Sequence, residues 1–193
     1  MNPALFLDRD GIINRRRVDD YVKRWEEFEF LPDIFGLLPK AHAAGFVVIV
    51  VTNQRGIARG LMTEQDLAEI HRQMQQELQQ RTGHRVDAIY HCPHGRADGC
   101  DCRKPKPGML LQAAAEHNIS LAESWLVGDS ESDVQAGIAA GCRAVLVDAA
   151  APTSTVAETV AESVATTLAS AWKYINTHAT RGKSQNLISS KHQ

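Results

Sequence analysis

The sequence predicts an α/β fold in which a parallel sheet is covered by helices on both faces. Two observations carry this prediction. Short apolar runs of strand length recur along the chain, and segments with the apolar spacing of helices separate them. Strands that alternate with helices form parallel sheets, and such sheets are buried on both faces.

The predicted strands are short and rich in aliphatic residues. The first is ALFL at residues 4–7, and the β-branched run FVVIVV at 46–51 is the second. Three further runs follow in chain order: DAIYHC at 87–92, SWLV at 124–127 and RAVLV at 143–147.

Helices are predicted between these strands. Residues 33–45 have a helical pattern, although Pro39 is expected to kink that helix or delay its start. The next helix starts after Thr63, the expected N-cap, with Asp66 three residues on in a near capping box, and Gly83 ends it. Two more helices are expected, one after Pro107 and one over residues 132–141.

A chain of 193 residues suits one compact domain, and we expect it to span residues 1–175. Residues 149–175 are rich in Ala, Thr and Ser and are expected to hold one short strand or helix at the edge of the core. Residues 176–193 are polar and without periodicity, which predicts a mobile tail.

Composition argues against several classes of partner. The net charge of −2 gives no field that would favour nucleic acid or an anionic membrane. No apolar run is long enough to span a bilayer, and the N-terminus lacks the features of a secretory signal. We therefore expect a protein in the cytoplasm with no nucleic-acid or membrane partner. We also expect it to be a monomer.

Polar residues follow three of the predicted strands. Asp8 and Asp10 come after the first, Thr52 and Asn53 end the second, and Asp129 follows the fourth. Each group could be only a turn or a helix cap. The carboxyl ends of parallel strands nevertheless share one edge of a sheet, which is where ligands bind.

Together these residues suit phosphoryl transfer. Asp8, Asp10 and Asp129 could converge on a hard divalent cation, while Thr52 and Lys104 could hold an anion opposite them. One carboxylate could act as nucleophile while the other handles a proton. Negative charge on Asp8 would help Asp10 to keep its proton.

The segments DRDG, VVTNQ, RKP and GDSESD, in this order, resemble the four motifs of the haloacid dehalogenase superfamily over roughly residues 5–147. The resemblance implies a Rossmann-like sheet and Mg²⁺-dependent phosphomonoester hydrolysis. No insertion long enough to fold into a large cap domain separates Asp10 from Thr52 or Thr52 from Lys104. It implies Asp8 as the nucleophile and Asp10 as the acid and base. It further implies phosphoryl-stabilising roles for Thr52 and Lys104, with Asp133 as support. The implied magnesium ligands are Asp8, the Asp10 backbone carbonyl and Asp129.

The loop at 92–102 carries Cys92, His94, Cys100 and Cys102. Four soft ligands in one loop are typical of a closed, tetrahedral zinc site. A disulfide or unconnected thiols are the alternatives, and cytoplasmic thiols stay reduced. Zinc would stiffen the loop and position Arg103 and Lys104. Cys142 is expected to be a buried apolar thiol.

The sequence leaves two zinc-loop phosphatases of the superfamily as alternative interpretations of its function. Most signature segments favour a sugar bisphosphatase, whereas the short zinc loop is closer to a histidinol-phosphate enzyme. A zinc-stabilised module that binds phosphate without catalysis is a third reading. Arg15, Arg16 and Arg17 form either a solvated turn or a site for a second phosphate. The expected substrate-binding residues are Asp19, Asp20, Tyr21, Asn53, Gln54, Arg55 and Arg103.

Overall fold

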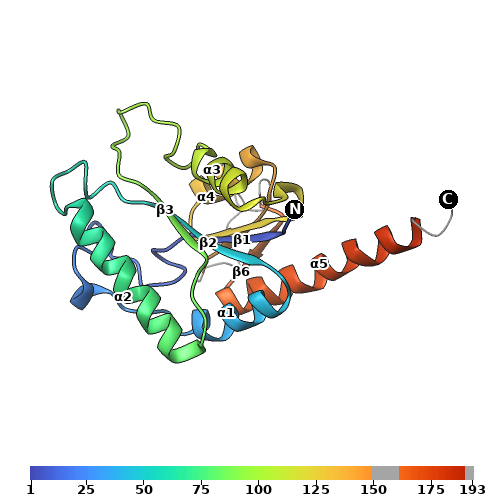
Figure 1. Ribbon diagram of the computed structural model, residues 1–193. Coiled ribbons are helices and arrows are strands. Elements are labelled where there is room, and N and C mark those ends of the chain that lie inside the picture. The colour runs from blue at the N-terminus through green and yellow to red at the C-terminus, as the bar shows by residue number, and fades with distance from the viewer. Residues whose placement is uncertain (149–160, 190–193) are drawn as a thin grey trace.

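A six-stranded, fully parallel sheet forms the centre of the protein in a computed structural model, which describes residues 1–148 and 161–189 (Figure 1). The strands lie in the order β3-β2-β1-β4-β5-β6. Their bounds are β1 Ala4–Leu7, β2 Val47–Asn53, β3 Ala88–Cys92, β4 Trp125–Gly128, β5 Arg143–Val147 and β6 Ser163–Ala165. The five predicted strands are confirmed, and the sixth lies in the segment for which one short element was expected.

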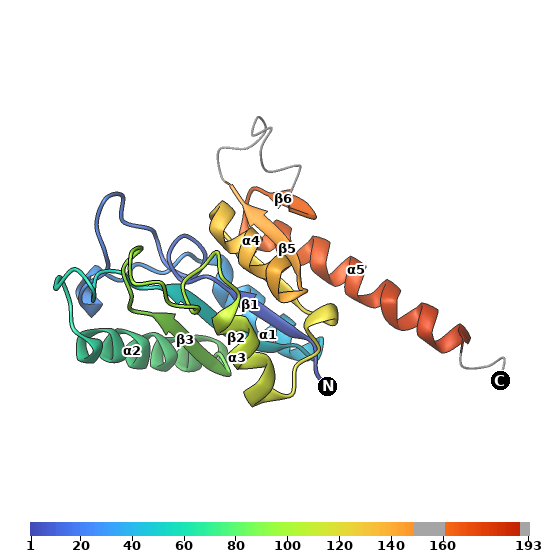
Figure 2. The same cartoon turned by 90° about the horizontal axis from the view of Figure 1, so that it is seen from above.

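Helices cover both faces of this sheet, as predicted. Their bounds are α1 Asp33–Ala43, α2 Glu64–Thr82, α3 Gly108–His117, α4 Glu131–Ala140 and α5 Leu168–Ser189, with short 3-10 helices η1 Trp25–Glu27 and η2 Leu121–Glu123. Helices α1, α2 and α5 pack on one face, and α3 and α4 pack on the other (Figures 1 and 2). In β1, Leu5 and Leu7 face the first layer while Ala4 and Phe6 face the second, so both faces of the strand are buried.

Helix α1 begins at Asp33 and contains Pro39, so the proline does not delay the start of the helix. Burial of Ile34, Leu37 and Leu38 against the core offsets the backbone hydrogen bond that a proline removes. The predicted start of α2 is confirmed. The Thr63 hydroxyl accepts from the Asp66 backbone, and the Asp66 carboxylate accepts from the Thr63 backbone N–H.

Residues 176–189, for which a mobile tail was expected, continue helix α5 (Figures 1 and 2). Their mobility stays a prediction. The apolar residues Leu168, Ala171, Trp172 and Ile175 anchor the start of α5 on the core. Once such a turn is fixed, each further residue adds a hydrogen bond at little cost. Residues 149–160 and 190–193 lie outside the described parts of the chain. Among the helices of the described residues, none could cross a membrane.

The strand order places a topological switch point between β1 and β4. The chain runs from β1 outward to β2 and β3, and later from β4 outward to β5 and β6. The carboxyl ends of β1, β2 and β4 therefore meet where open α/β sheets bind ligands. In the described parts of the chain, the loops at that edge contain only the short helix η1. The expectation of no large cap domain is thereby confirmed.

Candidate active site

A buried lysine connects the strand ends at this edge. The Lys104 side chain is 2 % exposed, and its Nζ lies 2.8 Å from Asp8 Oδ1 and 2.5 Å from Asp133 Oδ1. It also donates to the Val51 carbonyl oxygen at 2.7 Å. The Asn53 side chain pairs with the Lys104 backbone through two hydrogen bonds, which fixes the loop to the end of β2. Burial opposes a charged lysine, but Asp133 and Asp8 outweigh it and raise the Lys104 pKa.

Three carboxylates gather beside this ammonium. Asp8, Asp129 and Asp133 each offer an oxygen atom within 4.8 Å of the others. Burial raises the pKa of Asp8 to about 7 against the opposing charge of Lys104, and burial also raises the pKa of Asp129. Acids that crowd together in this way suit a hard divalent cation, which favours the charged carboxylate. Arg16 from the loop after β1 forms an ion pair with Asp129 at 3.1 Å.

Two glycines make the acidic cluster this tight. Gly11 has a φ of +97°, and a Cβ at this position would lie 2.0 Å from Asp129 Oδ2. A Cβ on Gly128 would lie 2.2 Å from the Cβ of Asp133. Any larger residue at either position would force the carboxylates apart, because real Cβ contacts are never this short. The glycines of DRDG and VGDS are therefore part of the site.

Asp10 has a different environment from Asp8. Its carboxylate accepts hydrogen bonds from the Arg9 guanidinium, from Asn14 and from Gln54. Burial would raise the Asp10 pKa, but the charge of Arg9 and these donors lower it below its usual value. In the metal-free protein the direction of the Asp10 pKa thus opposes the expectation that Asp10 keeps a proton because of Asp8, and the acid role of Asp10 stays a prediction.

A cleft of about 520 Å³ opens above these residues. Lys104 and acids that are buried or half-buried form its floor, and its more exposed rim carries arginines together with Asp19 and Asp20. The lining includes Asp8, Asp10, Thr52, Lys104, Asp129, Ser130, Ser132 and Asp133 at the floor, and Arg16, Arg17, Arg55, Arg59, Arg96 and Arg103 around it. The floor thus suits a cation, and the rim suits an anion.

Most of the predicted substrate-binding residues line this cleft. Those that do are Asp19, Asp20, Tyr21, Asn53, Arg55 and Arg103. Gln54 does not, because it is buried below the floor, where it donates to Asp10 and to the Thr52 hydroxyl. Arg15 also stays out of the lining and pairs with Glu29.

Sequence reasoning missed several residues around the site. Arg59 and Arg96 lie at the rim, and their charge is the only signal in the sequence. Arg9 and Asn14 are fully buried and hold Asp10. An arginine between two acids would ordinarily be assigned to solvent, so its burial follows only from the fold.

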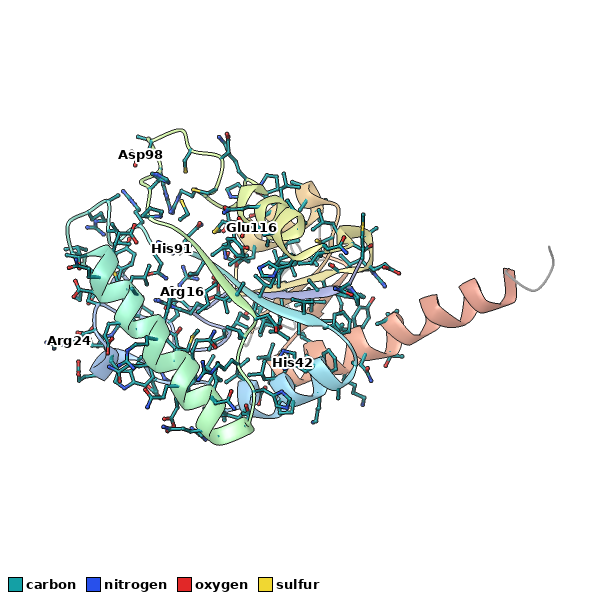
Figure 3. The ribbon with its side chains drawn as sticks, viewed as in Figure 1. Arg16, Arg24, His42, His91, Asp98 and Glu116 are labelled. Carbon is teal, nitrogen blue, oxygen red and sulfur yellow. The ribbon has the colours of Figure 1, made fainter. Side chains whose placement is uncertain are left out.

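The cysteine loop brings its four predicted ligands together. Cys92 Sγ lies 3.7 Å from Cys100 Sγ and 3.6 Å from His94 Nδ1, and His94 Nδ1 lies 3.2 Å from Cys102 Sγ. Tetrahedral zinc with bonds of about 2.3 Å to sulfur would separate two sulfurs by about 3.8 Å. The four donors therefore fit zinc. Figure 3 shows Asp98 at the tip of this loop, above the sheet.

Arg103 contacts the ligand loop, whereas the fourth cysteine, Cys142, is buried. Arg103 reaches back to the His94 carbonyl oxygen at 3.3 Å, which links the ligand loop to the rim of the cleft. All four cysteines are free thiols, so no disulfide forms. Cys142 is buried, as predicted, and burial raises its pKa to about 12.

A parallel sheet with an aspartate after β1, a threonine at the end of β2, a buried lysine and an acid after β4 defines a hydrolase of the haloacid dehalogenase type. The family profile described as HAD-hydrolase-like matches residues 101–171. Sequence comparison then places the chain more narrowly: it belongs to the family of the D-glycero-D-manno-heptose-1,7-bisphosphate 7-phosphatases.

Two curated relatives carry this assignment. The D-glycero-beta-D-manno-heptose-1,7-bisphosphate 7-phosphatase of Helicobacter pylori is 47 % identical over 71 % of this chain and 78 % of its own length. The D-glycero-alpha-D-manno-heptose-1,7-bisphosphate 7-phosphatase of Mycobacterium tuberculosis is 42 % identical over 76 % of this chain and 80 % of its own. The chain is therefore similar both to a phosphatase named for the beta anomer of the sugar and to one named for the alpha anomer.

The fold agrees with that assignment. A crystal structure of D,D-heptose 1,7-bisphosphate phosphatase from B. bronchiseptica, complexed with magnesium and phosphate, has a TM-score of 0.79 and 36 % identity. The match covers 91 % of this chain and 99 % of that one. A putative HAD-like phosphatase from Mesorhizobium loti has a TM-score of 0.78 and 32 % identity, over 92 % of this chain and 86 % of that one.

The buried ion pairs of Lys104 yield a first prediction. In Asp133→Asn, the buried ammonium loses one of its two anionic partners, so we expect the free energy of unfolding at neutral pH to fall by about 3 kcal/mol. Urea denaturation of the metal-free protein measures this loss. The matched control is Asp101→Asn, which removes the exposed partner of Lys106 and should change stability by less than about 1 kcal/mol. Equal effects of the two substitutions would contradict the structural importance of the Lys104 pairs.

Proposed function

We propose that the chain is a Mg²⁺-dependent phosphatase that removes the 7-phosphate of D-glycero-D-manno-heptose 1,7-bisphosphate. The observation that carries this proposal is the cleft itself, which joins an acidic floor to a rim of arginines. The floor suits a metal and the phosphate that reacts, and the rim suits a second phosphate. The names of the similar phosphatases support the same substrate.

The chemistry begins at Asp8. One oxygen of its carboxylate attacks phosphorus, and the bond from phosphorus to the sugar oxygen breaks, which leaves an aspartyl-phosphate on Asp8. Lys104 holds Asp8 in place through their ion pair, and the Thr52 hydroxyl and Lys104 stabilise the charged phosphoryl oxygens. Water then attacks the aspartyl-phosphate and restores Asp8.

Asp10 handles the protons. It gives a proton to the departing sugar oxygen and takes one from the attacking water. Its hydrogen-bond donors favour the carboxylate, so the substrate itself is a possible source of the first of these protons. A phosphate monoester has a second pKa of about 6, so part of it carries a proton near neutral pH. Asp10 can therefore relay that proton to the leaving oxygen.

Magnesium and zinc have separate sites in this proposal. Asp8, Asp129 and the Asp10 backbone carbonyl would hold Mg²⁺, which when bound supplies positive charge next to the phosphoryl oxygens. Asp133 supports this site by pairing with Lys104 and by accepting from the Ser130 backbone. Cys92, His94, Cys100 and Cys102 would hold a structural zinc ion.

The assembly of the cleft supports action as a monomer. Its lining comes from the loops of one chain. We infer that the enzyme is a cytoplasmic monomer without a nucleic-acid or membrane partner. Gel filtration that shows a stable dimer would contradict the first part of this inference.

The nucleophile assignment predicts that Asp8→Asn abolishes turnover. The amide keeps the shape of the carboxylate but does not attack phosphorus. Phosphate release from heptose bisphosphate measures the loss, while phosphate binding in the presence of Mg²⁺ checks that the cleft is intact. Activity within about tenfold of the wild type would reject Asp8 as nucleophile.

The zinc assignment predicts about one tightly bound zinc ion per chain, distinct from exchangeable magnesium. Cys100→Ala should lose that zinc and loosen the loop that leads to Arg103 and Lys104. Cys142→Ala is the control, because Cys142 is a buried thiol that joins no group of metal-ligating side chains among the described residues. Elemental analysis of protein purified without chelator distinguishes the variants. A zinc-free wild type, or a Cys100→Ala protein with full zinc content, would refute the site.

The substrate assignment predicts a strong preference for heptose bisphosphate over histidinol phosphate. Arg103→Ala should raise KM for the bisphosphate more than it lowers kcat, because the remote phosphate does not change charge in the transition state. A charge-assisted contact is worth about 1.5–3 kcal/mol, so we expect kcat/KM to fall by about tenfold or more. Arg85→Ala, an exposed arginine outside the cleft lining, should leave both constants unchanged.

A panel of heptose bisphosphate, fructose bisphosphate and histidinol phosphate tests this assignment. If the wild-type enzyme hydrolyses histidinol phosphate with equal or higher kcat/KM, the protein is a histidinol-phosphatase. If it hydrolyses no phosphate monoester in Mg²⁺, the reading as a non-catalytic phosphate-binding module replaces both enzymes.

A further inference from the structure

The arginine of DRDG, Arg9, lies in the chain between the two reacting carboxylates and enters the mechanism above only as a donor to Asp10. Its side chain is fully buried, and Nη2 donates to Asp10 at 3.1 Å and 3.0 Å. Nη1 lies 3.2 Å from His71 Nε2, on helix α2. The Arg9 Nε atom, also buried, has no hydrogen-bond partner among the described residues. The hydrogen bonds that orient this guanidinium therefore join it to Asp10 and to His71.

His71 is an unusual residue for its position. It lies in the buried stripe of α2, among Leu67, Ile70 and Met74, and is only 9 % exposed. A guanidinium only donates hydrogen bonds, so His71 Nε2 must be the acceptor and Nδ1 must carry the ring hydrogen. Burial lowers the pKa of His71 to about 3, and the charge of Arg9 acts in the same direction. The ring is therefore neutral in the folded protein.

The surroundings hold this ring in one orientation. The groups that face it are Arg9, Asp10 and His91. The His91 ring, on β3, meets it edge to face with ring centroids 6.2 Å apart. His91 in turn bonds Glu64 at the start of α2 at 2.8 Å, and Figure 3 shows its place beside that helix. The neutral His71 ring is thus held in place as a hydrogen-bond acceptor for the Arg9 guanidinium.

We infer that His71 is a positioning residue for the phosphatase reaction, which acts on Asp10 through the hydrogen bond that it accepts from Arg9. Without this acceptor, the Arg9 guanidinium can rotate and carry the Asp10 carboxyl away from the leaving oxygen. The inference rests on the proposed role of Asp10. A displacement of about 1 Å in such a group can cost about 100-fold in rate.

The nature of the leaving group provides the test. When the aspartyl-phosphate forms, the bond from phosphorus to the leaving oxygen breaks, and a sugar oxygen must take the Asp10 proton. A p-nitrophenolate leaves as the anion and needs no proton. The constant kcat/KM reports only the steps up to this departure, so it is independent of the later attack by water. Loss of Asp10 positioning should therefore slow the sugar substrate selectively.

The experiment measures kcat/KM for heptose bisphosphate and for p-nitrophenyl phosphate in several variants. In His71→Leu, which removes the acceptor, we expect about tenfold or more loss for the sugar and less than about threefold for the aryl phosphate. His71→Gln should restore the sugar reaction to within about threefold, because its amide oxygen reaches the place of Nε2. His71→Asn is polar but too short to reach Arg9, so it should behave as His71→Leu and also serves if that protein does not fold.

Controls separate positioning from packing and from the proposed function. Met74→Leu, one turn along the same buried stripe, should leave the ratio of the two substrates unchanged. Equal losses for both substrates in His71→Leu or His71→Asn would overturn the inference and leave a structural role. Asp10→Asn should show the same selective loss as those variants. If Asp10→Asn slows both substrates equally, the acid role of Asp10 fails and the inference fails with it. If it is selective and the His71 variants are not, the inference alone fails.

Discussion

The site depends on the ion pairs and the hydrogen bond that the buried Lys104 ammonium makes. It lies between Asp8 at the end of β1, Asp133 at the start of α4 and the Val51 carbonyl of β2. A buried charge is tolerated only when it is paired and hydrogen-bonded, so three elements must come together for the loop after β3 to fold inward. The same contacts counter the repulsion among the carboxylates of the floor. One lysine therefore sets both the geometry and the charge balance of the cleft.

The surroundings of Asp8 and Asp10 differ although the two residues are neighbours in the chain. Asp8 is buried, and burial raises its pKa, whereas Arg9, Asn14 and Gln54 lower the pKa of Asp10. Environments that make the pKa values of two carboxylates different are a common way to give the two groups separate roles. The donors around Asp10 favour the form that accepts a proton from water. The raised pKa of Asp8 falls once a cation joins the cluster, so metal binding and nucleophile charge are coupled.

The sequence predicted the parts of the site that depend on the backbone. Asp8, Thr52 and Asp129 follow strands that a simple apolar pattern identifies, and parallel strands end at a common edge. The sequence did not predict the contacts that depend on side-chain packing. Arg9 and His71 are both polar residues at buried positions, where charge and polarity alone would assign solvent exposure. The continuation of α5 over a polar segment was missed for a related reason, since its anchor on the core precedes that segment.

Net charge gave little information about the ligand, because acids and arginines gather together in the cleft. The whole chain carries −2, yet six arginines surround an acidic floor. A cleft concentrates the field of the charges that line it, so local pattern outweighs the total. A molecule with one phosphate at the floor and another near the rim would engage both regions. The arrangement of charge, rather than its sum, therefore matches a sugar with a phosphate at each end.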